Sequence, residues 1–354
     1  MIEIDGSLLE GGGQILRSSV ALSALTGDPV KVTKIRAKRE RPGLQAQHIS
    51  AVEAMARLVD ARVEGLQRGS QSIEFYPKQI RGGQFRIDVG TAGSVSLILQ
   101  ALAPVACFAP SGVSLELIGG TDVPFSPTFD FLGLVFIPII RRMGCQITAQ
   151  LTRRGHYPRG GGTVRVTITP VLDRLASIRL DEFGEVDNIK GVSHAVRLPR
   201  HVATRQADAA KERLVRNGYK NVEIEVWHMD DQISQLGPGS GIALCASTTT
   251  NALIGSDCLG ERGKPAEQVG LEAANKLIGL LDKRCTVDLN LSDMMIPYIA
   301  LADGKSTMLT SDLSLHTKTN MAIVKEFVNT EFAISQMKNF QIISCNGVGF
   351  KRRR

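Results

Sequence analysis

The chain has 354 residues, enough for two domains, and its 43% hydrophobic and 22% charged residues allow a large buried core. No apolar run reaches the roughly 18 residues of a membrane span, and the N-terminus has no basic leader followed by an apolar core. We therefore expect a cytoplasmic protein without membrane attachment. The net charge of +7 favours a polyanionic partner.

The cysteines form no CxxC pair, a pattern that predicts free, buried thiols in a reducing compartment. They are Cys107, Cys145, Cys245, Cys258, Cys285 and Cys345.

The first 170 residues predict the same order of elements twice. Strands are expected at 2–4, 30–35, 61–66 and 72–76, with helices at 14–25 and 45–59. A second set of strands is expected at 84–89, 113–118, 146–151 and 163–169, with helices at 95–108 and 129–143. The period of roughly 80–90 residues predicts a structural repeat.

A third copy is expected after residue 285, with strands at 285–289, 306–309, 332–336 and 340–344 and helices at 293–301 and 321–328. Residues 180–284 do not fit the repeat, and they read as an inserted α/β domain. We expect an α/β (α+β) fold with three βαβαββ units. Residues 1–179 and 285–340 would form the catalytic domain, and residues 341–354 a C-terminal strand and basic tail.

His316 lies where a strand-like run meets the second helix of this third copy. A histidine at such a junction is held on a rigid element, and its ring can face a cleft. The nearby Lys318 and the amides of the helix N-terminus would favour phosphate.

Glycine-rich turns precede helices at 11–13 and 90–93, and another lies at 119–120. Such turns present backbone amides without side-chain obstruction. Together with Arg17, Arg36, Arg39 and Gln47 they suggest a polyphosphate cleft, because arginine gives phosphate paired hydrogen bonds. Glu10 either neutralises a helix N-terminus or binds a divalent cation, and both roles stay open.

A second basic cluster, Arg153, Arg154 and Arg159, surrounds three consecutive glycines and is also expected to bind phosphate. His156, within the same loop, is expected to be a turn or surface residue. The basic residues 351–354 are expected to form a frayed tail.

The run Arg154-Gly155-x-x-Pro158-x-Gly160-Gly161-Gly162-x-Val164 resembles the signature of the RNA 3′-terminal phosphate cyclase family. Further matches cover nearly the whole chain. They are residues 10–17 (Glu-Gly-Gly-Gly-Gln-Ile-Leu-Arg), 35–37 with 41–44 and 47–48, and 119–122.

The resemblance implies three units similar to the C-terminal domain of translation initiation factor three, with a small inserted domain. It also implies that RNA with a 3′-phosphate end reacts with ATP to give a 2′,3′-cyclic phosphate, AMP and pyrophosphate. The family's catalytic histidine falls on His316, which would carry AMP covalently before an RNA-3′-pp-5′-A end forms.

The same resemblance assigns the remaining site residues. Glu10 would bind Mg²⁺ or Mn²⁺. Phosphates of ATP or of the RNA end would be held by Arg17, Arg36, Arg39, Gln47 and Gln100. Pro127 and Phe131 would flank the adenine, and Asp293 would lie near the nucleotide. Some relatives have an aromatic residue and a glutamine where this chain has Asn290 and Met294, so adenine binding would depend more on Pro127 and Phe131.

Three alternatives remain: a non-catalytic relative acting in ribosomal RNA processing, an enolpyruvyl transferase, and an RNA-binding protein attracted by charge alone. The presence of His316 with Glu10 and Arg17 favours the cyclase. A homodimer is compatible with the sequence.

Overall fold

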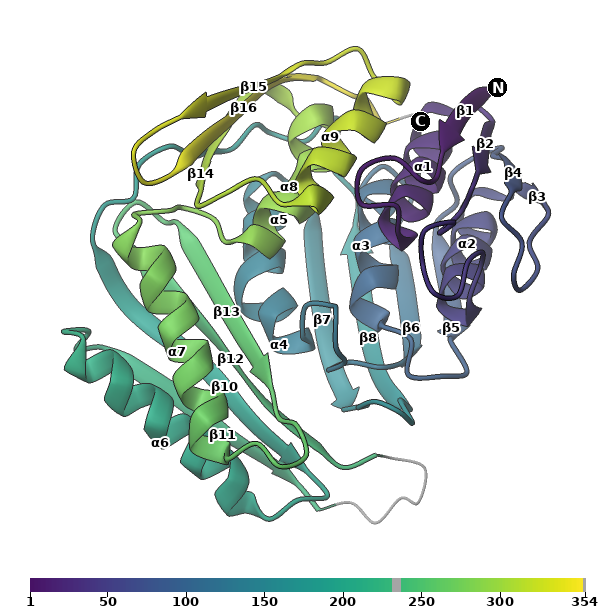
Figure 1. The fold of residues 1–354 in the computed structure, drawn as a ribbon. Helices are drawn as coiled ribbons and strands as arrows, with labels where there is room; N and C mark the ends of the chain where they lie inside the picture. The colour runs from purple at the N-terminus through teal and green to yellow at the C-terminus, as the bar shows by residue number, and fades with distance from the viewer. Residues whose placement is uncertain (231–236, 353–354) are drawn as a thin grey trace.

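The computed structural model describes residues 1–230 and 237–352, so Arg353 and Arg354 of the basic tail lie outside the described residues. Its strands form four sheets of four strands each. Three of these sheets share one topology, and the fourth belongs to the inserted segment (Figure 1). The fold is mixed α/β, as the sequence predicts.

In the first unit, one helix connects the first two strands, which run parallel, and a second helix follows the second strand. Its sheet has the order β1-β2-β4-β3. The elements are β1 (Ile2–Asp5), α1 (Gly13–Thr26), β2 (Val30–Thr33), α2 (Ala46–Val59), β3 (Arg62–Glu64) and β4 (Ile73–Tyr76).

The second unit repeats this arrangement with the order β5-β6-β8-β7. The predicted helix at 129–143 is divided, because a π-helical turn, η1, lies between two α-helical segments. The elements are β5 (Gly83–Asp88), α3 (Val95–Ala106), β6 (Val113–Gly119), α4 (Phe129–Phe131), η1 (Leu132–Phe136), α5 (Ile137–Arg142), β7 (Gln146–Arg153) and β8 (Gly162–Thr169).

The third unit has the equivalent order β9-β14-β16-β15, and its first strand precedes the insertion. The prediction of a strand at 285–289 is wrong: β9 pairs in parallel with β14, and α8 begins at Leu289. The insertion therefore interrupts the third unit after its first strand. The elements are β9 (Arg179–Leu180), α8 (Leu289–Leu301), β14 (Asp303–Thr310), α9 (Leu315–Phe327), β15 (Phe332–Gln336) and β16 (Gln341–Val348).

The inserted segment has its own hydrophobic cluster, while a second, larger cluster extends through the three units. Two long helices cover one face of its sheet (Figure 1). Its elements are β10 (Val186–Val196), α6 (Arg200–Arg216), β11 (Val222–Met229), β12 (Gly239–Thr248), β13 (Leu253–Leu259) and α7 (Ala266–Asp282). None of the helices in the described ranges is long and apolar enough to cross a membrane.

The prediction that all cysteines are free is wrong, because Cys107 and Cys145 form a disulfide. Cys107 follows α3 and Cys145 precedes β7, so the pairing depends on the folded second unit. The other four cysteines are free and buried. Cysteine usage therefore gives no support to a reducing compartment.

The disulfide joins two cysteines 38 positions apart. A crosslink of this span lowers the conformational entropy of the unfolded chain, which stabilises the folded state by about 3–4 kcal/mol. We expect Cys107→Ser/Cys145→Ser to lower the free energy of unfolding by about this amount in denaturant titrations. Dithiothreitol should lower the stability of the wild type to that of the variant and leave the variant unchanged. A wild type insensitive to dithiothreitol would contradict the pairing.

Candidate active site

A cavity of about 360 Å³ lies where helices of all three units meet, and we call it the central cavity. His316 reaches it from the first turn of α9, where the Oγ of the N-cap Ser314 accepts a hydrogen bond from the Thr317 amide at 3.0 Å. The wall consists of Gln14, Arg17, Leu97, Gln100, Phe125, Ser126, Pro127, Asp257, Asn290, Asp293, Met294 and His316. The cavity thus contains five of the residues that the sequence singled out as site residues: Arg17, Gln100, Pro127, Asp293 and His316.

Buried Asn320, one helical turn after His316, fixes α9 against two other helices. Its Oδ1 accepts hydrogen bonds from Gln14 at 3.0 Å and from Ser18, both on α1. Its Nδ2 donates to the backbone oxygen and to Oδ1 of Asp293 on α8, at 3.2 and 2.5 Å. The side chain therefore positions the first and third units around the cavity.

Asp293 and Arg17 give the cavity an anionic and a cationic group, and Asp257 adds a second carboxyl group to the wall. Burial raises the pKa of Asp293 to about 6, while the charges of His316 and Arg17 and hydrogen bonds from Asn320 and Gln100 act in the opposite direction. Burial lowers the pKa of Arg17 to about 10, which leaves its guanidinium charged at neutral pH. Arg17 Nη2 also donates to Gln14 Oε1 at 2.8 Å, so its orientation is fixed.

Glu10 and Arg39 pair with each other beside the cavity. One carboxylate oxygen of Glu10 contacts Arg39, and the other accepts from the Gly12 amide at 2.7 Å. A Cβ on Gly12 would lie 2.1 Å from Oε1 of this carboxylate, so a larger residue there would displace the Glu10 side chain. The Glu10 amide lies 3.4 Å from Thr319 Oγ1, which places the turn against α9.

Arg36 and Gln47 lie outside the central cavity. Arg36 Nη1 donates to the backbone oxygens of Arg41 and Gly43, at 2.6 and 3.0 Å, and thereby braces its own loop. Gln47 lines an adjoining groove of about 710 Å³. Leu97 and Phe125 line both hollows, so the two are adjacent.

Phe131 does not line the cavity, because its side chain is 1% exposed and packs in the core against Gly255. Phe125, which the sequence reading did not select, is fully exposed and lines the cavity. Gln14 and Asn320 were also missed. Gln14 directly follows the first glycine turn. Asn320 stands four residues after His316, a spacing that puts the side chains of His316 and Asn320 on one face of the helix.

Comparison with known proteins agrees with this geometry. Residues 8–334 match the family described as RNA 3′-terminal phosphate cyclase. A relative with that name from Pyrobaculum aerophilum is 48% identical over 99% of this chain and 99% of its own. Another from Ignicoccus hospitalis is 52% identical over 93% of each chain, and one from Caldivirga maquilingensis is 49% identical over 100% of each.

The chain belongs to the RNA 3′-terminal phosphate cyclase family. Members of this family are ligase-class enzymes. Among solved structures, the enolpyruvyl transferase NikO from Streptomyces tendae aligns with a TM-score of 0.37 and 9% identity, over 98% of this chain and 48% of that one. Similarity this low says nothing about function.

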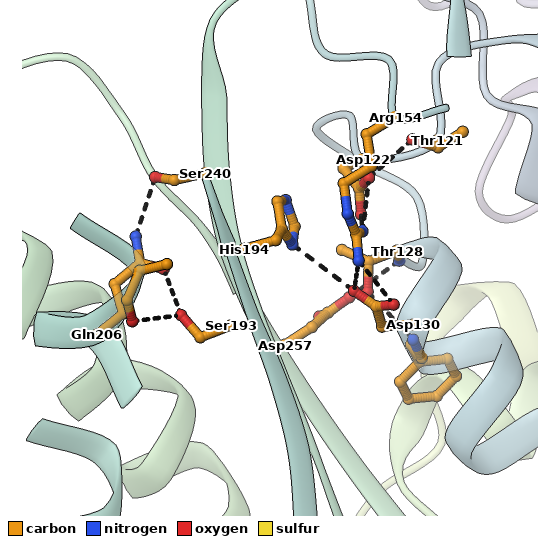
Figure 2. Close-up of polar contacts among 12 residues, drawn as sticks. Thr121, Asp122, Thr128, Asp130, Arg154, Ser193, His194, Gln206, Ser240 and Asp257 are labelled. Carbon is orange, nitrogen blue, oxygen red and sulfur yellow. Dashed lines mark hydrogen bonds and ion pairs between the residues drawn. The ribbon is translucent and has the colours of Figure 1, made fainter. Parts of the chain in front are cut away.

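The family's signature loop is structural here. Arg154 is 2% exposed and lies between two carboxylates, with Nη1 3.1 Å from Asp122 Oδ2 and Nη2 2.7 Å from Asp130 Oδ2 (Figure 2). The expectation that Arg154 binds phosphate is therefore wrong. His156 is expected to be a turn or surface residue; it begins a turn, with its backbone oxygen accepting from the Gly160 amide at 2.7 Å, but at 5% exposure it is not a surface residue.

The glycines of this loop allow backbones to pack closely. A Cβ on Gly155 would lie 2.3 Å from the Gly162 amide nitrogen and 2.4 Å from the Gly119 carbonyl oxygen. A Cβ on Gly160 would lie 2.6 Å from the Thr91 oxygen. These glycines join the three glycine-containing turns of the second unit directly to one another.

We expect Arg154→Ala to lower the free energy of unfolding by about 3–5 kcal/mol, because it leaves two buried carboxylates without their cation. The affinity of the folded fraction for ATP should not change, since Arg154 lies outside the central cavity. Denaturant titration and calorimetry measure the two effects separately. Arg165→Ala, at an exposed position on β8, is the control and should change stability by less than about 0.5 kcal/mol. Weaker ATP binding with unchanged stability would instead favour a phosphate-binding role.

Proposed function

We propose that this protein converts RNA 3′-phosphate ends to 2′,3′-cyclic phosphates at the expense of ATP, with His316 as the nucleophile. The main support is the position of His316, which shares a cavity with Arg17, Gln100 and Asp293. Membership of the cyclase family adds to it. AMP and pyrophosphate are the other products.

The first step forms a phosphorus–nitrogen bond. A neutral ring nitrogen of His316 attacks the α-phosphorus of ATP, and the bond to pyrophosphate breaks. Phosphate esters are poor electrophiles, and a covalent intermediate divides one difficult displacement into easier ones. Arg17 supports this step because a fixed guanidinium stabilises charge on phosphate oxygens.

The second and third steps use the RNA end. An oxygen of the RNA 3′-phosphate attacks the phosphorus on His316, which frees the ring and forms RNA-3′-pp-5′-A. The neighbouring 2′-hydroxyl oxygen then attacks the 3′-phosphorus, loses its proton and expels AMP. Because this closure is intramolecular, effective molarities of about 10⁵–10⁸ M are available to it.

The bound nucleotide would contact the walls that the cavity offers. The adenine would pack on Pro127 and Met294, since Phe131 is buried in the core. The RNA end would approach along the groove that contains Gln47, where Arg41 and Arg68 supply positive charge and Phe125 an exposed ring. Cationic grooves with aromatic side chains are typical of single-strand binding.

Glu10 is suited to bind Mg²⁺ or Mn²⁺, because its carboxylate offers the oxygen ligands that these ions prefer. Such an ion would neutralise charge on the ATP phosphates. The Arg39 contact would then have to open, or Arg39 would shift to a phosphate.

Labelling with α-³²P-ATP tests the nucleophile. The wild type should carry an acid-labile, alkali-stable label on a denaturing gel, and His316→Ala should carry none, since no other group is proposed to form the bond to phosphorus. His201→Ala, at an exposed position on α6, is the matched control and should label like the wild type. Label that persists in His316→Ala would reject His316 as the nucleophile.

The pH dependence of labelling tests the role of Asp293. With a pKa of about 6, this carboxyl group is ionised above pH 6 and protonated below it. The ionised form favours the positive charge that develops on His316 during attack. We expect the wild type to label about tenfold faster than Asp293→Asn at pH 8, a difference that corresponds to about 1.4 kcal/mol.

The ratio of the two rates should fall towards unity as the pH drops through about 6 in single-turnover assays, because wild-type Asp293 is then neutral too. A ratio that stays constant from pH 8 to pH 5 would exclude this role for Asp293.

A further inference from the structure

A buried cluster of one carboxylate and two imidazole rings resembles a metal site. Asp122 follows β6, His156 lies in the loop between β7 and β8, and His194 belongs to β10 of the inserted segment. Their exposed fractions are 1%, 5% and 1%. One ligand atom from each lies within 4.8 Å of the others.

The two imidazole rings approach each other through the atoms that bind metals. His156 Nε2 and His194 Nε2 are 3.1 Å apart. Two nitrogens that bind one tetrahedral ion at about 2.0–2.1 Å stand about 3.3 Å apart. Among the described residues, neither ring finds a hydrogen-bond partner for its Nδ1.

The surroundings carry excess negative charge. Asp122 and Asp130 share one guanidinium, that of Arg154, whose charge lies over the Trp227 ring at 4.9 Å. A buried site with two carboxylates and one cation favours an additional positive charge.

Residues around the three side chains also hold them in orientation, as the residues around metal ligands usually do. Thr121 Oγ1 donates to Asp122 Oδ2 at 2.7 Å, and Arg154 orients the same carboxylate. Asp130 Oδ2 is 3.6 Å from His194 Nδ1 (Figure 2). In metal sites, the histidine nitrogen that does not bind the metal often faces a carboxylate, which orients the imidazole ring.

We propose that Asp122, His156 and His194 bind a divalent transition-metal ion of the zinc type, which fastens the inserted segment to the second unit. Two imidazoles and one carboxylate are ligands that zinc accepts readily. Water occupies the fourth position, because Asp122 and His156 line a hollow of about 670 Å³ through which solvent and the ion can enter. The site is distinct from the cation that Glu10 would hold.

The geometry also explains a glycine in the inserted segment. A Cβ on Gly239 would lie 2.1 Å from Cγ of His156, so β12 can cover this ring only with glycine. β12 thereby holds the His156 ring in place. The three proposed ligands come from separate parts of the chain that meet only in the folded protein.

Metal analysis of the untagged full chain tests the proposal. After incubation with Zn²⁺ and gel filtration, the wild type should retain about one equivalent of zinc per chain. His194→Gln and His156→Gln should each reduce the zinc retained by at least about tenfold. His201→Gln removes an exposed histidine of the same segment and should retain the metal. Glu10→Ala should retain it too, which separates this site from the nucleotide's cation.

Two further measurements guard against misfolded variants. Cobalt-loaded wild type should show the visible absorption bands of tetrahedral Co²⁺, a readout that needs no variant. Zinc should raise the melting temperature of the wild type, since a ligand that binds only the native state stabilises it, and should leave that of His194→Gln unchanged.

Wild type that retains no zinc and shows no cobalt bands would overturn the proposal, and the two histidines would then form a simple hydrogen bond. Zinc retained equally by both histidine variants would overturn it as well.

Discussion

The contact between α1 and α9 is the constraint on which the proposed active site depends. It is made by buried Asn320, whose amide is held by Gln14 and Ser18 on one side and by Asp293 on the other. A buried amide is costly unless its hydrogen bonds are all made, so this side chain permits one arrangement of the three helices. His316 stands one turn away on α9, and its direction follows from that arrangement. The proposed nucleophile and Arg17 face one cavity because residues of the first and third units, more than 300 positions apart in the chain, are hydrogen-bonded there.

A second constraint holds the signature loop. Its glycines bring backbones within contact of the 91–93 and 119–120 turns, and Arg154 neutralises the carboxylates buried beneath them. The family signature in this chain therefore marks the packing of the second unit, and its Arg154 lies outside the cavity of the proposed catalytic residues. The insertion contacts this same region through His194, so the loop also determines where the inserted segment sits.

Much of the fold follows from local sequence. Glycine turns, β-branched strands and amphipathic helices predict the repeated order of elements, because each of these signals acts within a few residues. β9 has only two residues and pairs with a strand more than 120 residues later, so no local signal marks it. The role of Arg154 was missed for a similar reason: its partners are 24 and 32 residues away, and burial is a property of the tertiary structure. Four of the five predicted site residues in the cavity lie on helices, and Pro127 lies in the loop before α4. Phe131 and Phe125 lie close together in sequence, and only packing distinguishes them.

A crystal structure of the protein frozen after reaction with ATP and Mn²⁺ tests the central claim most directly. The account predicts continuous electron density from a ring nitrogen of His316 to the phosphorus of AMP. The base should lie against Pro127, and the phosphate oxygens should lie within hydrogen-bond distance of Arg17. AMP attached to another side chain would contradict it, as would a nucleotide bound in a different hollow with His316 out of reach.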